Sequence, residues 1–137
     1  MKIRAIKSHF INSLIWRGRK LTAERFFSTL LMSLKSKTGI APLDVFYYSM
    51  LSLRPLVFLR PVRVGSVFYK VPAPITEHRR RLYAIKFVLQ SAQDSRGLIT
   101  LDRVQHLLHS IYTATKNAAF DKKITVYREA LENRSFI

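Results

Sequence analysis

The chain has 137 residues, of which 24 are Lys or Arg and only 8 are Asp or Glu, giving a formal net charge of +16. So large a positive excess opposes compaction unless a polyanion offsets it; nucleic acid is the first class to consider and an anionic membrane surface the second. Hydrophobic residues make up 48% of the chain, enough for the packed core of one domain. The lack of Cys excludes disulfide frameworks, thiolate catalysis and cysteine-ligated zinc, and no apolar run approaches the ~18 residues of a membrane span.

Three helices are predicted in the first part of the chain. Residues 8–16 place apolar side chains at helical spacing until Gly18 interrupts the pattern. A second helix is predicted from about residue 21 to residue 36, where apolar side chains again recur at helical spacing. Pro42 fits the first turn of a third helix, which must end before Pro55.

A β-hairpin is predicted in the middle of the chain. Residues 56–60 and 67–71 are rich in β-branched and aromatic side chains, and Gly65-Ser66 lies between them. Three prolines confine these strands to a sheet edge or a free ribbon: Pro61, Pro72 and Pro74. Because a two-stranded ribbon is marginally stable alone in water, we expect it to project onto a partner.

Three more helices are predicted in the last part. Thr76 can cap a helix that runs to about residue 93, Ser95 to Gly97 form a turn, and Thr100 can cap the next helix. A final helix is predicted from about residue 121 to residue 134. The side chains expected to face the core in these helices are Leu82, Ile85, Val88, Leu89, Ala92, Val104, Leu107, Leu108, Ile111, Val126, Tyr127, Ala130 and Leu131.

These elements predict a mainly α fold. We expect residues 1–137 to form a single domain, a bundle of about six helices with an inserted, protruding two-stranded β-hairpin. Helices one to three occupy about 8–53, the hairpin about 56–74, and helices four to six about 76–135. No internal repeat or long linker indicates a second domain.

The residue patterns typical of enzymes and metal sites are missing. His106 and His109 have a spacing that can share a metal, but no carboxylate or third His lies beside them in sequence. There is no Gly-rich phosphate loop and no G-x-S-x-G motif. Surface pairing with Arg128 explains Glu129 and Glu132 better than acid–base chemistry. We therefore expect a protein that is not an enzyme, with no metal and no cofactor.

Cations mixed with aromatic side chains form the informative pattern. Residues 16–20 (WRGRK) place three cations around a helix break, a corner that can meet a phosphate with side chains and free backbone N–H groups. Residues 78–81 (HRRR) open a helix, where clustered cations are unfavourable to the helix dipole unless an anion lies beside them. The predicted hairpin offers both cations and stacking side chains: Arg60, Arg63, Lys70, Phe68 and Tyr69.

This pattern favours RNA over two alternatives. A basic helical DNA-binding protein would need a recognition helix that offers Arg, Asn or Gln to base edges, and no helix here has one clearly. A membrane-surface protein would oppose its basic face to a broad apolar face on one exposed helix. The apolar stripes of this chain instead have neighbouring helices to pack against.

Four segments resemble the universal family of small-subunit ribosomal protein seven, in the family's order and over nearly the whole chain. FINSLIWRGRKLTAE (10–24) is similar to the family signature, in which a helix ends in Gly-Lys-Lys followed by Ser-Thr-Ala-Glu. Here Arg19 replaces the first Lys and Leu21 the Ser. The other three segments resemble the family's third helix, its hairpin with the following helix, and its last helix: LDVFYYSMLSLRP (43–55), RPVRVGSVFYKVPAPITEHRRRLYAIKF (60–87) and KKITVYREALENRSF (122–136).

The resemblance implies a structural constituent of the small ribosomal subunit that binds the 3′ major domain of small-subunit rRNA, organises head assembly and lies near the exit-site tRNA and mRNA path. Its expected partners are rRNA and neighbouring head and platform proteins, with no membrane and no homo-oligomer. The residues expected to contact rRNA are Lys7, Arg17, Arg19, Lys20, Arg25, Arg54, Arg79, Arg80, Arg81, Lys122 and Lys123. The hairpin residues expected on the tRNA and mRNA side are Arg60, Arg63, Val64, Gly65, Ser66 and Tyr69.

The chain also departs from the family pattern. The family usually carries a basic extension before its first helix, here reduced to Met1–Ser8, and Gly-Ser stands at the hairpin tip where Gly-Gly is usual. Such drift, with many Phe and Leu, favours a mitochondrial member. Residues 1–20 have the Arg-rich, acid-free look of a transit peptide, but their second half matches the family's first helix, so cleavage would remove core. We therefore expect an organelle-encoded protein of the mitochondrial ribosome, with the bacterial cytoplasm or a plastid as the alternative.

Overall fold

The computed structural model describes residues 2–93 and 96–136 of the chain. In these residues six α-helices and one antiparallel pair of strands follow in the order α1 (Lys2–Leu14), α2 (Lys20–Thr38), α3 (Pro42–Leu53), β1 (Val57–Val64), β2 (Val67–Pro74), α4 (Glu77–Ala92), α5 (Leu101–Tyr112) and α6 (Ala118–Glu132). A short 3-10 helix, η1 (Arg134–Phe136), follows α6. The predicted mainly α architecture, with a hairpin between the third and fourth helices, is confirmed.

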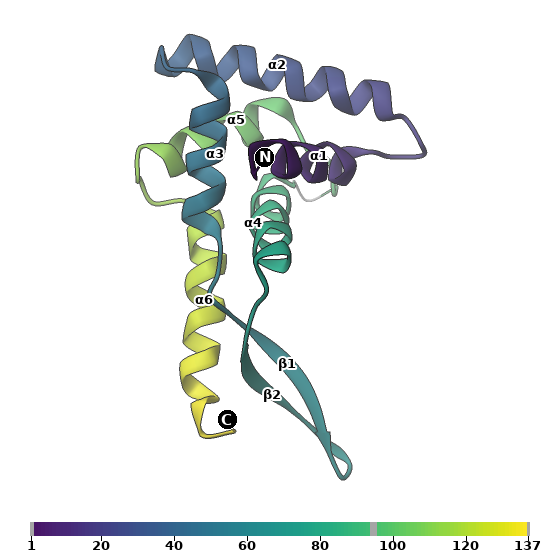
Figure 1. Ribbon diagram of the computed structural model, residues 1–137, viewed down its shortest axis with the longest axis vertical. Helices are drawn as coiled ribbons and strands as arrows, with labels where there is room; N and C mark the ends of the chain where they lie inside the picture. The colour runs from purple at the N-terminus through teal and green to yellow at the C-terminus, as the bar shows by residue number, and fades with distance from the viewer. Residues whose placement is uncertain (1, 94–95, 137) are drawn as a thin grey trace.

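The elements form a helical body and a protruding arm (Figure 1). Helices α1 to α5 make the body, with α2 lying across its top in Figure 1. The hairpin and α6 leave the body in the same direction, and α6 packs along β1 while η1 packs on β2. The arm is therefore not a free ribbon, because a helix supports one of its sides. None of the described helices is long and apolar enough to cross a membrane.

Three aromatic rings join the first three helices. Phe10 of α1, Phe27 of α2 and Phe46 of α3 are buried, and their ring centroids lie 5.2 to 5.8 Å apart. Two of the three pairs meet edge to face, an arrangement that contributes beyond the area that the rings bury. Since each ring comes from a different helix, this cluster fixes the mutual packing of α1, α2 and α3.

Helices α4 and α5 complete the core much as predicted. The α5 stripe is buried as expected: Val104, Leu107, Leu108 and Ile111. On α4 the buried residues include Ile85, Val88, Leu89 and Ala92, but the prediction for Leu82 was wrong, because this side chain is 38% exposed. Leu82 lies in the first half of α4, before the buried stretch of this helix begins at Ala84.

The prediction for α6 was wrong at Leu131, which is 65% exposed. Ala130 is buried and Val126 and Tyr127 are half-buried, as expected of the side that faces the hairpin and α4. Leu131 follows Ala130 directly and so points about 100° away around the helix, off that side. A sequence pattern alone does not reveal that α6 runs along the arm with only one side covered.

Helix boundaries shifted at both ends of the chain. Helix α1 begins at Lys2 rather than near residue 8, with Ile6 buried one turn before Phe10; Met1 lies outside the described residues. Helix α6 begins three residues early, at Ala118, because the side chain of Asn117 accepts hydrogen bonds from the N–H groups of Ala119 and Phe120, both at 3.1 Å.

Two expected caps and one turn need comment. Thr76 and Thr100 occupy the N-cap positions of α4 and α5, but neither side chain makes a capping hydrogen bond, so that part of the prediction was wrong. Of the turn expected at residues 95–97, Ser95 lies outside the described residues, and Arg96 is in a turn with Gly97 after it.

The strands are longer than predicted and run through the prolines. Val57 pairs with Pro74 and Val64 with Val67, which leaves Gly65-Ser66 as a two-residue turn. Gly65 has a φ of 64°, a conformation that glycine adopts without strain and that suits a tight hairpin turn. Prolines are tolerated because each strand of a two-stranded ribbon has one edge without a neighbouring strand.

Candidate nucleic-acid interface

The cations of the α1–α2 corner are exposed side chains on a strained turn. Arg17 has a φ of 52° and Gly18 a φ of 73°, so two consecutive residues adopt the left-handed conformation. The N–H of Arg19 donates to the carbonyl of Trp16 at 3.2 Å, and that of Lys20 to Gly18 at 3.0 Å. The tight turn therefore uses these two amides itself, and the expectation that other N–H groups of the corner meet a phosphate stays a prediction. The exposed side chains of Arg17, Arg19 and Lys20 remain available.

A shallow groove between α1 and α2 gathers further cations. Its cavity of about 190 Å³ is lined by Arg4, Lys7, Ser8, Ile11, Asn12, Lys20 and Glu24. Three cations and two polar side chains against one carboxylate make a site suited to an anion. The structure thus brings the predicted residues Lys7 and Lys20 together, and it adds Arg4, which the sequence analysis missed. Helical spacing of Arg4 and Lys7 on one face was the signal that could have found Arg4.

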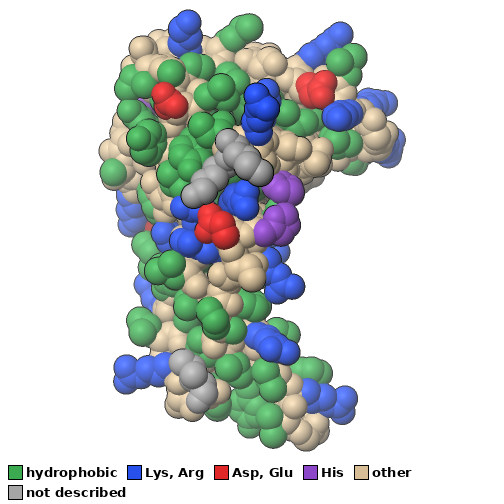
Figure 2. Space-filling view, in the orientation of Figure 1, with side chains coloured by type: hydrophobic (Ala, Val, Ile, Leu, Met, Phe, Trp, Pro, Cys, Tyr) green, Lys and Arg blue, Asp and Glu red, His purple; other side chains and the backbone are tan. Residues whose placement is uncertain are grey.

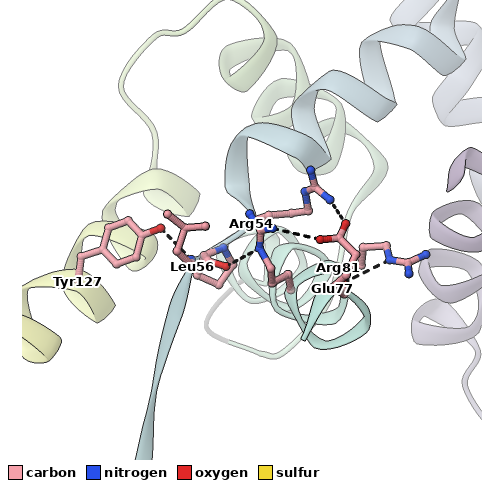
Figure 3. A network of polar contacts seen from close by, with 7 residues as sticks. Arg54, Leu56, Glu77, Arg81 and Tyr127 are labelled. Carbon is pink, nitrogen blue, oxygen red and sulfur yellow. Dashed lines mark hydrogen bonds and ion pairs between the residues drawn. The ribbon is translucent and has the colours of Figure 1, made fainter. Parts of the chain in front are cut away.

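A joint where the arm leaves the body holds three more of the predicted residues. Figure 3 shows Arg54, at the end of α3, and Glu77, in the first turn of α4, joined by an ion pair. Arg80 donates from Nη1 to the same carboxylate at 3.1 Å and from Nε to the carbonyl of Pro55 at 2.9 Å. Only 18% of the Arg54 side chain is exposed. Arg54 and Arg80 therefore have partners within the chain.

Lys123 and Tyr127 complete the joint from the side of α6. The ammonium of Lys123 donates to the carbonyl of Ser52 at 2.7 Å. Figure 3 shows Tyr127 reaching the residue just before β1, where its hydroxyl accepts a hydrogen bond from the N–H of Leu56 at 3.0 Å. Burial, and secondly the positive charge of Arg80, lower the pKa of Lys123 below its ordinary value. The joint thus ties α3, β1, α4 and α6 together with more positive than negative charge.

The remaining predicted cations, three near the joint and one on α2, are exposed to different degrees. Arg79 is exposed, with its guanidinium 6.0 Å from the ring centroid of Phe58. Arg81 is half-buried and donates a long hydrogen bond of 3.4 Å to the carbonyl of Glu77 (Figure 3). Lys122 is half-buried and Arg25 on α2 is exposed. Of the HRRR run, Arg79 is therefore the side chain best placed to meet another molecule.

The tip of the hairpin carries exposed cations and aromatic rings. Arg63 donates from Nε to the carbonyl of Gly65 at 3.0 Å, and its guanidinium lies 5.9 Å from the Phe68 ring centroid. The other expected tip residues Arg60, Val64, Gly65 and Ser66 are exposed. Tyr69 is different, because its half-buried ring lies 4.9 Å from that of Phe136 and so holds η1 against the hairpin.

The predicted residues thus fall into three groups, at the α1–α2 corner, at the joint and at the hairpin tip. Figure 2 shows Lys and Arg side chains at the far end of the upper body and along the arm, with few acidic side chains on this face. Within the described residues no three His, Asp or Glu side chains gather in a way that could hold a metal ion. Such a surface offers cations and aromatic rings, and these are the groups that bind phosphates and bases.

Comparison with known proteins decides the family. The family of ribosomal protein S7p/S5e matches residues 2–134, almost the whole chain. The chain belongs to this family. The S7p/S5e chain is therefore a structural, non-enzymatic protein of the small ribosomal subunit, and the resemblance that the sequence indicated is confirmed.

Relatives of the S7p/S5e chain come from bacteria and from a mitochondrion. It is 35% identical over 129 residues to small ribosomal subunit protein uS7 of Thermomicrobium roseum, an alignment that covers 93% of this chain and 81% of the relative. It is 31% identical to the protein of the same name of Thermosipho melanesiensis over 94% and 83% of the two chains. It is 29% identical to small ribosomal subunit protein uS7m of Reclinomonas americana over 93% and 79%.

Proposed function

We propose that this chain binds the 3′ major domain of small-subunit rRNA, helps to organise assembly of the subunit head, and places its hairpin near the exit-site tRNA and mRNA path. The charge balance carries this proposal. Even if each of the 8 acidic residues paired with a different cation, 24 − 8 = 16 Lys and Arg would have no acidic partner. A polyanion supplies the missing negative charge, and membership of a ribosomal family makes RNA that polyanion.

In this proposal some cations contact RNA directly and others act by fixing the direction of the arm. Exposed cations of the corner and of the start of α4, such as Arg19, Lys20 and Arg79, contact phosphates directly. Half-buried cations of the joint, Arg54 and Arg80, act indirectly, because they hold the direction in which the arm leaves the body. The angle of the arm then decides whether the corner and the hairpin tip can reach RNA at the same time.

The hairpin tip is the part of the chain proposed to lie on the tRNA and mRNA side. Its exposed cations and Phe68 suit a single strand better than a duplex, because unpaired bases expose a face on which an aromatic ring can stack. Neighbouring head and platform proteins would cover apolar side chains that the body and α6 leave exposed, among them Leu131.

Filter binding tests the proposed rRNA contact. The chain is titrated against the 3′ major domain of a small-subunit rRNA, a scrambled RNA of equal length and duplex DNA over a series of salt concentrations. Affinity for all three nucleic acids falls with salt. The slope of log K against log salt concentration is roughly −0.7 to −0.9 for each phosphate neutralised. We expect a preference of at least ~100-fold for the rRNA domain to survive at high salt, within the usual range of specific over non-specific binding. Equal affinity for the three would contradict the proposal.

Charge reversal separates direct from indirect contacts. Arg79→Glu should weaken rRNA binding at least about tenfold while the helical circular dichroism stays unchanged and the thermal midpoint does not fall, because an acidic side chain in the first turn of α4 suits the helix dipole. Arg80→Glu should also destabilise the fold by about 1–3 kcal/mol, since it removes both hydrogen bonds and sets a second carboxylate beside Glu77. Lys86→Glu, an exposed change of the same charge on α4, is the matched control. Unchanged affinity of Arg79→Glu would sink this site.

We further propose that the protein works in a mitochondrial ribosome. The Phe- and Leu-rich drift of the sequence supports this proposal, and a uS7m protein stands beside bacterial ones among the relatives that match. Sucrose-gradient sedimentation of purified organelles, followed by mass spectrometry of the small-subunit fraction, tests it. Recovery of the chain with plastid or bacterial subunits instead would overturn the assignment.

A further inference from the structure

An apolar cavity opens beside the α1–α2 corner. Its volume is about 440 Å³, within the ~300–1,000 Å³ usual for small-molecule pockets. Among the described residues that line it, apolar and aromatic side chains predominate and none is acidic; they include Leu14, Ile15, Trp16, Arg19 and Phe26. The cationic groove that holds Lys7 and Lys20 is a separate cavity.

Trp16 is the unusual residue of this cavity. It is the only Trp of the chain, and it is 62% exposed although it lines an apolar cavity. The guanidinium of Arg17 lies 4.2 Å from the centroid of its ring and so covers one face of the indole. A planar aromatic group can therefore still stack on the other face. Trp16 therefore lies at the edge of the cavity with an exposed surface that a ligand could bury.

The backbone holds this arrangement in place. Arg17 adopts a left-handed conformation, with a φ of 52°, which is costly for a residue with a side chain. The hydrogen bond from the N–H of Arg19 to the carbonyl of Trp16 closes the turn that carries both side chains. Local strain of this kind persists only where the surrounding structure imposes it, and it often accompanies a binding site. The platform of Trp16 and Arg17 is thus formed before any ligand arrives.

We propose that this platform and its cavity bind one unpaired RNA base, which stacks on Trp16 while Arg17 and Arg19 contact the flanking phosphates. The inference rests on the proposed rRNA binding and names a subsite for it. Two observations favour an RNA base over an apolar protein segment: the ring available for stacking and the cations on the rim. Stacking between a base and an aromatic ring tolerates every base, so the subsite selects an unpaired base and not a particular sequence.

Because Trp16 is the only Trp, its fluorescence reports on this site alone. The full chain is titrated with two RNAs of equal length and charge, a hairpin with an unpaired purine-rich loop and a fully paired duplex. We expect the loop RNA to quench Trp16 emission and to protect it from iodide, whereas the duplex binds through phosphates and leaves the emission nearly unchanged. Both titrations are done at a salt concentration at which binding of each RNA, followed by filter retention, is complete.

Two variants make the test quantitative. Trp16→Ala should lower affinity for the loop RNA at least about fivefold, the lower end for loss of one base–aromatic stack, and should leave duplex affinity unchanged. Trp16→Phe keeps a ring and should restore most of the loss, which guards against a fold defect in the Ala variant. Loop RNA that binds without any change in Trp16 emission, or with equal affinity for Trp16→Ala, overturns the inference and leaves the proposed rRNA binding intact. Trp16-dependent loop binding without a preference for the rRNA domain would support the subsite and refute the proposed function.

Discussion

Lys123 is a cation whose surroundings disfavour its positive charge. Its ammonium donates to the carbonyl of Ser52 and lies 5.7 Å from the ring centroid of Tyr127, contacts that favour the charged form. Burial and the neighbouring Arg80 outweigh these two contacts, because the pKa of Lys123 is lowered from its ordinary value of 10.5. The charge of Lys123 therefore lowers the stability of the free protein.

This shift predicts a dependence of stability on pH. The unfolded chain holds the Lys123 proton more tightly than the folded chain does, so the free energy of unfolding rises with pH between the lowered pKa and 10.5. The destabilising contribution is fully present below that range. Lys123→Met should abolish this part of the rise, which is measured as the urea midpoint at neutral pH and near pH 10.

The control for this prediction is Lys86→Met, because it removes one positive charge from an exposed position of α4. Both variants lower the net charge equally, so a difference between their pH profiles belongs to Lys123. If the two profiles coincide, the joint does not perturb Lys123 and the account of its burial fails.

At the residue scale the sequence could locate the cations but could not rank them. Arg79, Arg80 and Arg81 are equivalent in the HRRR run, and only the structure separates exposed Arg79 from Arg80, which bonds to Pro55 and Glu77. The ion pair of Arg54 with Glu77 joins residues 23 apart in sequence, so no local pattern predicts it. Long-range partners of this kind depend on how α3 and α4 meet, which local periodicity does not specify.

The hairpin and α6 depend on each other as elements. The ammonium of Lys70 on β2 lies 3.2 Å from the carboxylate of Glu129 on α6, and the Tyr69 ring packs on Phe136. These contacts lie outside the main core, so they steady the arm without holding the body together. The predicted free ribbon is for this reason a supported one, and the support explains how strands that contain three prolines stay paired over eight residues each.

Shortening the hairpin tests whether the body is stable independently of the arm. Deletion of Val62, Arg63, Phe68 and Tyr69 removes two cross-strand residue pairs. The remaining side chains keep their alternation between the two faces of the ribbon. We expect the free energy of unfolding to change by less than about 1 kcal/mol, because the deleted side chains lie outside the main core. Urea unfolding followed by circular dichroism measures it. A loss of several kcal/mol would mean that the arm is part of the cooperative fold.

A change in the aromatic cluster of α1, α2 and α3 should, unlike the hairpin deletion, destabilise the protein strongly. Phe46→Ala removes the ring that contacts both Phe10 and Phe27, and it should destabilise the protein by about 3–5 kcal/mol, as expected for a fully buried ring. Phe68→Ala, at an exposed position of the hairpin, is the matched control and should cost less than about 0.5 kcal/mol. Similar costs for the two changes would contradict the assignment of the core.

At the element scale the sequence predicted all six helices and the turn of the hairpin because apolar periodicity and Gly65 are local signals. It misjudged the start of α1, since Ile6 continues the stripe of Phe10 across a segment that also looked like a basic extension. It also misjudged Leu131, because the side of a helix that is covered depends on its neighbours. Local patterns therefore gave the elements, and packing decided which faces are buried.

Over the whole molecule the net charge of +16 acts against the fold and in favour of the RNA partner. Mutual repulsion among exposed cations weakens the folded state at low ionic strength, where the Debye length is long. Phosphates of an RNA relieve the same repulsion, so binding and folding are linked. Salt should therefore affect the free chain and the complex in opposite directions.

This opposition is measurable as thermal midpoints of the free chain and of its complex with the rRNA domain, between about 50 mM and 500 mM NaCl. The midpoint of the free chain should rise as salt screens the repulsion. The extra stability given by RNA should shrink, because contact with six to ten phosphates loses about 10³–10⁵ in affinity between 50 and 200 mM salt. A variant with Gln at exposed Lys35, Lys37, Arg103 and Lys116 lowers the net charge from +16 to 16 − 4 = +12 and should show a shallower rise. A free-chain midpoint that is flat or falls with salt would show that repulsion contributes little, and the argument from charge to an RNA partner would lose its physical basis.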